Sequence, residues 1–124
     1  MSKTAAKTLE DPRYRFPAPP FKQQKLLEGT GESDKMNPQP DHGELIYQGS
    51  GRLQGLNAII TGSDSGIGRA VAIAFGREGA NVLITCYENK QDAETTASIL
   101  DSEPIETEIF AGDLRERDTC KACI

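Results

Sequence analysis

The chain has 124 residues and a net charge of −5, with eight basic and seven acidic side chains in residues 1–55 against six and twelve in residues 56–124. Because binding to a phosphate backbone needs a basic surface, this acidic part disfavours nucleic acid as a partner. No apolar run approaches the roughly 18 residues of a membrane span and no apolar segment follows the first lysines, so we expect a cytoplasmic protein without a membrane partner.

Residues 1–55 have the composition of a disordered-like, proline-rich arm. Six of the seven prolines fall there, and no apolar periodicity is visible. We favour a solvated tail, because docking must offset about 1–2 kcal/mol of ordering entropy per residue. The alternative is an arm that wraps a neighbouring subunit through its apolar side chains, which are Tyr14, Phe16, Phe21, Leu26 and Leu27. Residues 56–124 then form the only packed unit, of marginal size.

A short buried strand is predicted over 57–61 and an amphipathic helix over 67–78. The strand pattern consists of Leu56, Ala58, Ile59 and Ile60, and the helical spacing of Ile67, Ala70, Val71, Ala74 and Phe75. Between them lies the turn Thr61-Gly62-Ser63-Asp64-Ser65-Gly66-Ile67-Gly68. Three glycines that join a strand to a helix are typical of a dinucleotide-binding site, although a glycine-rich turn without a ligand is the alternative.

Each glycine of this turn has a physical role in the predicted site. Gly62 can adopt the positive φ that leaves the strand sharply, Gly66 lacks the Cβ that would block a pyrophosphate, and Gly68 allows the helix to pack closely. The N–H groups of the first helical turn and the positive end of the helix dipole would then face the phosphates.

The remaining pattern predicts a strand over 81–86, a helix over 90–101, a strand over 105–110 and a third helix from about 115. Gly79 is expected to end the first helix and Asn89 to cap the second. Strands that alternate with helices predict parallel pairing with right-handed crossovers. We therefore expect an α/β fold, one βαβαβ half of a doubly wound Rossmann sheet with strand order 3-2-1, in which the first strand becomes an edge.

The spacing T-G-x3-G-x-G over Thr61–Gly68 resembles the short-chain dehydrogenase/reductase family. Ala111-Gly112-Asp113-Leu114 is similar to the segment of that family whose Asp lies against the adenine ring. The lead-in 47–53 and Met36-Asn37-Pro38 further resemble a bacterial branch described as glucose/ribitol dehydrogenase-like. The resemblance, from about Pro38 onward, implies NAD or NADP as cofactor, hydride transfer with an alcohol/carbonyl pair, a sugar or polyol-like substrate and a homo-oligomer for the full-length relative.

With the glycine argument, the resemblance implies a set of cofactor-binding residues along the turn and after the second and third strands. These residues are Gly62, Ser63, Asp64, Ser65, Gly66, Ile67, Gly68, Tyr87, Glu88, Asp113 and Leu114.

The family's catalytic Tyr-x3-Lys pair has no counterpart in this sequence. The residues four positions after its three tyrosines are Ala18, Gly51 and Gln91. We therefore expect no catalytic residue in this chain, which resembles the N-terminal half of such an enzyme, cut in its third helix. A non-catalytic dinucleotide-binding module and an interrupted gene product without activity are the alternatives.

The choice between NAD and NADP rests on the residues after the second strand. A carboxylate there binds the ribose hydroxyls of NAD, whereas a basic side chain binds the 2′-phosphate of NADP. Glu88 favours NAD, Lys90 is the nearest lysine, and Ser65 stands where many NADP-preferring relatives carry a basic residue. Asp64 would repel a phosphate, so we expect it to cap the helix. The sequence favours NAD, with use of both cofactors as the close alternative.

Cys120 and Cys123 form a C-x-x-C that could be a redox pair or half of a zinc site. Zinc needs four ligands, and the only histidine, His42, lies in the arm. A redox pair needs its first Cys at a helix N-terminus, whereas this helix should begin before Cys120. We expect ordinary helix positions and no metal site.

Overall fold

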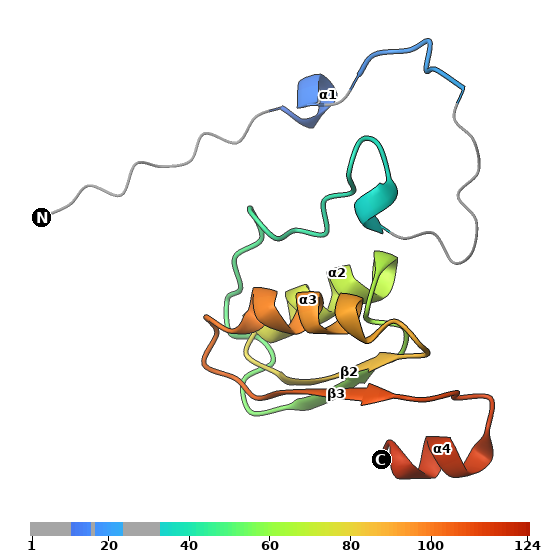
Figure 1. The fold of residues 1–124 in the computed structure, drawn as a ribbon. Coiled ribbons are helices and arrows are strands. Elements are labelled where there is room, and N and C mark those ends of the chain that lie inside the picture. The colour runs from blue at the N-terminus through green and yellow to red at the C-terminus, as the bar shows by residue number, and fades with distance from the viewer. Residues whose placement is uncertain (1–10, 16, 24–32) are drawn as a thin grey trace, which may run out of the picture.

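The structure is a computed structural model that describes residues 11–15, 17–23 and 33–124 (Figure 1). In chain order its elements are α1 (Pro12–Arg15), the 3-10 helix η1 (Ser33–Lys35), β1 (Asn57–Ile60), α2 (Gly66–Arg77), β2 (Asn81–Cys86), α3 (Lys90–Leu100), β3 (Thr107–Ala111) and α4 (Arg117–Ala122). The three strands pair in parallel in the order β1-β2-β3. The predicted α/β fold, with its first strand at an edge, is confirmed.

Helices α2 and α3 cover one face of the sheet, and α4 lies on the opposite side (Figure 1). The core between the two helices and the sheet is apolar, because alternate strand residues point at the helices. Its buried members are Ile60, Ala72, Val82, Ile84, Cys86, Ala93 and Leu100. The other face is largely open: Ile59, between Ala58 and Ile60, is 49% exposed. The interpretation of the first strand as buried is therefore wrong for Ile59 and Leu56.

The helix α2 buries a different face from the predicted one. Ile67 and Phe75, both assigned to the apolar face, are exposed, and the buried residues are Arg69, Ala72, Ile73 and Gly76. A Cβ on Gly76 would lie 2.6 Å from Leu100 Cδ2. Contact of α2 with α3 as well as with the sheet explains the difference, since the small residues allow two neighbours to approach.

Two boundaries differ from the prediction by two residues, and the others by at most one. The third strand begins at Thr107 rather than at 105, because Ile105 turns against the core and its N–H bonds to the Glu103 carbonyl. The last helix begins at Arg117 rather than near 115. Both the Asp113 carboxylate and its carbonyl accept backbone N–H bonds there, from Arg115 and Glu116, and so hold the chain in a turn. The predicted caps are confirmed: Gly79 follows α2 with φ 96°, and the Asn89 side chain accepts from Asp92 N.

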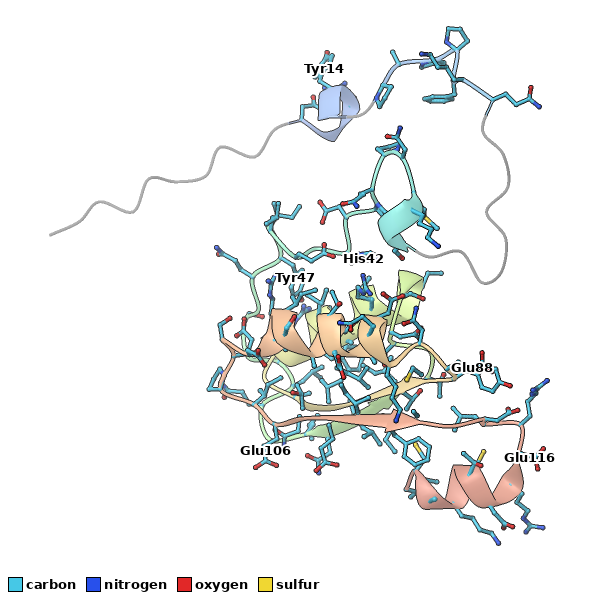
Figure 2. All side chains as sticks on the ribbon, viewed as in Figure 1. Tyr14, His42, Tyr47, Glu88, Glu106 and Glu116 are labelled. Carbon is cyan, nitrogen blue, oxygen red and sulfur yellow. The ribbon has the colours of Figure 1, made fainter. Side chains whose placement is uncertain are left out.

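Part of the predicted arm packs against the C-terminal end of α2. The Arg77 guanidinium donates to the carbonyls of Gly43, Glu44 and Tyr47 at 2.6–2.7 Å. A Cβ on Gly49 would lie 1.7 Å from Arg77 O, which shows how closely the two segments approach. Figure 2 shows Tyr47 beside the helical layer. The interpretation as a solvated tail is wrong for this stretch, whereas a domain boundary at residue 55 stays a prediction.

Glu78, which follows the last residue of α2, completes this attachment. Its carboxylate accepts from Tyr47 OH, from the backbone N–H groups of Ser50 and Arg52, and from the Arg52 guanidinium at 2.6 Å. These donors, the Arg52 guanidinium first, hold the pKa of Glu78 far below its ordinary value.

In the earlier part of the arm, Tyr14 and Phe21 are exposed. Phe16, Leu26 and Leu27 lie outside the described residues.

Candidate functional site

The three parallel strands end at the same edge of the sheet, and the connections that follow them surround a cleft of about 600 Å³. Ligands of open α/β sheets bind at this carboxyl edge. Figure 2 shows Glu88 at this edge and Glu106 at the opposite end of the sheet. The cleft is lined by Thr61, Gly62, Thr85, Cys86, Tyr87, Gly112, Asp113, Leu114 and Arg115. Gly62, Tyr87, Asp113 and Leu114 are thus the predicted site residues that line it directly.

The glycine turn has the backbone geometry that the sequence predicts. Gly62 has φ 62° and Gly66 has φ 52°, and a Cβ at either position would meet no heavy atom within 4 Å. At Gly68 a Cβ would lie 2.1 Å from Gly62 O. The third glycine therefore lets the first turn of α2 lie against the glycine turn, while Gly62 and Gly66 face open space.

Ser63 and Thr85 hold the turn against β2. Ser63, fully buried, donates its hydroxyl to Ile60 O at 2.7 Å and accepts from Thr85 N at 3.0 Å. The Thr85 hydroxyl accepts from Gly62 N and donates to Ile60 O. Ser63 thus stabilises the turn from its buried side. Thr85 is a residue that the sequence reasoning missed, and a buried threonine at a strand end carries no distinguishing pattern.

The N-terminus of α2 has no side-chain cap. Ser65 is the N-cap with an extended backbone, and its side chain makes no capping hydrogen bond. The first N–H groups of a helix have no carbonyl partner inside it, so those of Gly66, Ile67 and Gly68 are suited to an anion. The expectation that Asp64 caps this helix is wrong. The N-cap position is occupied by Ser65, and Asp64 lies one residue before it. The Asp64 carbonyl instead accepts from Arg69 Nε and the Thr96 hydroxyl.

The end of β2 presents Tyr87 and Glu88, both exposed. The Arg115 guanidinium lies 5.8 Å from the centroid of the Tyr87 ring, within cation–π range. Glu88 and Lys90 do not line the cleft, because the chain turns away there into α3 and Lys90 N bonds to Glu88 O. Cys86, beneath this loop, is buried, and burial raises the pKa of its thiol.

The end of β3 presents Asp113 paired with Arg115. The guanidinium reaches both carboxylate oxygens at 2.6–3.1 Å. This pairing lowers the pKa of Asp113 to about 2, so the group is ionised at neutral pH. The sequence reasoning missed Arg115. Its position two residues after Asp113 was the available signal, because a side chain that close can fold back onto the carboxylate.

The profile of short chain dehydrogenases matches residues 56–124, more than half of the chain. The chain belongs to the short-chain dehydrogenase family. It is 44% identical over 95 residues to the uncharacterized oxidoreductase YhxD of Bacillus subtilis, covering 76% of this chain and 32% of that protein. It is 38% identical over 117 residues to the uncharacterized oxidoreductase YghA of Escherichia coli, covering 94% and 40%.

Two further relatives have more specific names. Glucose and ribitol dehydrogenase of Daucus carota is 36% identical over 110 residues, which cover 84% of this chain and 38% of that protein. Among solved structures, the promiscuous reductase LugOII, which catalyses keto-reduction at C1 during lugdunomycin biosynthesis, matches with a TM-score of 0.54 and 34% identity. That match covers 57% of this chain and 29% of the other. The chain spans about a third of the length of these short-chain dehydrogenase relatives.

The cysteines of this short-chain dehydrogenase chain lie in two places: Cys86 ends β2, and Cys120 and Cys123 lie in and just after α4. All three are free, and Cys120 lies inside α4, as expected, with its Sγ against Leu114 O at 2.9 Å. Within residues 11–15, 17–23 and 33–124, no group of three His, Cys, Asp or Glu side chains could hold a metal ion. In the same ranges, no helix has the length and apolar character needed to cross a membrane.

Proposed function

We propose that this chain is the dinucleotide-binding part of an NAD(P)-dependent oxidoreductase that acts on an alcohol/carbonyl pair, sugar or polyol-like. The observation that carries the proposal is the open glycine turn at the carboxyl edge of the sheet, with uncapped helix donors beside it. The names of the relatives support the reaction class, since they include oxidoreductases, a glucose and ribitol dehydrogenase and a keto-reductase.

The residues of the turn divide the work of holding the cofactor. The backbone N–H groups of Gly66, Ile67 and Gly68 would bind the pyrophosphate, and the bare Gly62 and Gly66 leave it room. Ser63, Asp64 and Ser65 shape the turn rather than contact the base. The adenosine would lie in the cleft between Tyr87 and the pair Asp113 and Leu114, where the Asp113 carboxylate, ionised at neutral pH, can accept from an amino group. When bound, the nicotinamide ring supplies the hydride chemistry.

A non-catalytic dinucleotide-binding module is the second candidate. It is favoured by one observation, that none of the three tyrosines has a lysine four residues later. A proton-transferring side chain must lie within hydrogen-bond reach of the reacting oxygen. In the oxidoreductase proposal, that side chain belongs to sequence outside these 124 residues. A non-catalytic module needs no such side chain.

The test is a calorimetric titration of the chain with NAD and with NADP, comparing Gly66→Asn with Gly55→Asn. Both glycines have positive φ and open space around a Cβ, and asparagine tolerates that backbone, so strain is matched. Only Gly66 lies at the proposed pyrophosphate position. We expect Gly66→Asn to weaken binding by at least about tenfold, through steric exclusion, and Gly55→Asn to leave the affinity unchanged. Equal affinities in the two variants would refute the site.

A further inference from the structure

Arg69 is a buried arginine on the first turns of α2, with 7% of its surface exposed. Its Nε and Nη2 both donate to Asp64 O, at 3.0 and 2.5 Å, and Nη2 also donates to Asp92 O at 3.3 Å. The Asp92 carboxylate lies 3.7 Å away. A charge at this depth is costly unless it is fully hydrogen-bonded, and an apolar side chain would avoid that cost.

The partners of Arg69 belong to the two loops that flank the proposed cofactor site. Asp64 is the centre of the glycine turn, and Asp92 lies in the first turn of α3, just after the Tyr87–Asn89 loop. The Thr96 hydroxyl closes the same cluster, since it accepts from Arg69 Nε at 3.0 Å and lies 3.2 Å from Asp64 O and 3.1 Å from Asp92 O. One guanidinium therefore ties the turn expected at the pyrophosphate to the helix that follows the ribose loop.

We propose that Arg69 is a positioning residue for the dinucleotide: it fixes the spacing between the glycine turn and the β2–α3 loop, so that pyrophosphate and adenosine ribose are bound together. This inference rests on the proposed function. The planar fork is essential, because a lysine ammonium could keep the charge but could not hold the Asp64 and Asp92 carbonyls in a fixed arrangement. The residue acts through the backbone of Asp64 and touches no part of the ligand itself.

A second arginine of the same helix provides a matched control. Arg77 is also largely buried and donates to three backbone carbonyls, where Arg69 donates to two, but it does so at the opposite end of α2, away from the cleft. Arg69→Met and Arg77→Met each remove a guanidinium that satisfies carbonyl groups, so both should lower the unfolding midpoint. Only the first should change how the glycine turn is held.

The experiment measures ADP binding to the full 124-residue chain by calorimetry, with unfolding midpoints recorded for every variant. We expect Arg69→Met to weaken ADP binding by about tenfold or more, Arg69→Lys to recover only part of that loss, and Arg77→Met to bind ADP as the wild type does. Amide hydrogen exchange at Gly62–Ser65 should accelerate in Arg69→Met and stay unchanged in Arg77→Met. A purely structural role would move both variants alike.

The milder variant Thr96→Val removes only the hydroxyl and covers the case in which Arg69→Met does not fold. We expect it to weaken ADP binding by about threefold. A wild-type chain that binds no ADP would overturn the proposed function and this inference together. Wild-type binding, with unchanged ADP affinity in the Arg69 and Thr96 variants, would overturn this inference alone.

Discussion

The two ends of α2 differ in how their polar groups are hydrogen-bonded. At the C-terminal end, here called the saturated end, Arg77 and Glu78 hydrogen-bond to five backbone groups of residues 43–52. At the N-terminal end, the Ser65 side chain leaves the helix uncapped, and the space beside Gly66 is empty to 4 Å. The saturated end is a structural attachment, whereas the open end keeps donors and volume for something that the chain itself does not supply.

This difference has an energetic cost that the fold must absorb. Uncapped helix donors forgo roughly 1 kcal/mol of capping stability. Arg69, Ser63 and Thr85 offset the loss by fixing the turn from beneath, through hydrogen bonds that leave its upper side free. The turn at the open end is thus held in place while the space beside it stays empty. Because the turn is already ordered, an anion can bind there without a further entropy cost of ordering the backbone.

The largest expected effect breaks the open end itself. Gly68→Ala would place a Cβ 2.1 Å from Gly62 O, a backbone contact that cannot move without shifting the turn. We expect a loss of about 2–3 kcal/mol in the free energy of unfolding, which would leave a domain of this size largely unfolded. Ser65→Ala is the control, with a loss below about 0.5 kcal/mol because that side chain makes no cap bond. Denaturation midpoints measure both. A wild-type midpoint for Gly68→Ala would show that the helix can move away.

The next effect tests the saturated end through pH. The pKa of Glu78 is lowered in the folded chain, so its contribution is complete above the ordinary value of 4.5 and is lost as the pH falls below it, where the unfolded carboxylate takes up a proton first. We expect Glu78→Gln to unfold at a lower temperature than the wild type at pH 7, and this difference to narrow below pH 4.5. The exposed Glu94→Gln on α3 is the control, with only a small difference from the wild type at pH 7. A difference in unfolding temperature between Glu78→Gln and the wild type that does not change with pH would contradict the lowered pKa of Glu78.

The order of the elements could be predicted because it depends on local pattern. The run at 81–86 and the turn around Gly62 and Gly66 are determined by alternation and by backbone requirements that only glycine meets easily. The caps at Gly79 and Asn89 follow from the same local chemistry. For these features, neighbouring residues carry nearly all of the determining interactions.

The errors arose where the decisive partner is distant in sequence. Ile67, Phe75 and Ile59 were assigned to the interior from their apolarity, but among the described residues they are 86%, 37% and 49% exposed. Arg69 and Glu78 are charged and no sequence pattern marks them as interior, yet both are buried and hydrogen-bond to Thr96 and Arg52, respectively. Such contacts depend on tertiary geometry. The site was therefore predictable in its backbone turn and not in the side chains that hold it.

The smallest expected effect concerns whether the open end distinguishes NAD from NADP. Glu88 and Lys90, on which the sequence interpretation rested, do not line the cleft, whereas Arg115 does. A 2′-phosphate could attract the Arg115 guanidinium only in competition with the Asp113 carboxylate, which already binds it through three contacts. Because exposed ion pairs exchange at little cost, we expect the two cofactors to bind within about threefold of each other. Arg115→Gln should then weaken NADP relative to NAD by about threefold, while Lys90→Gln, at the start of α3, should leave the ratio unchanged. Dissociation constants for both cofactors measure this ratio. A larger change in the ratio for Lys90→Gln than for Arg115→Gln would show that the residues after β2, and not Arg115, distinguish NAD from NADP.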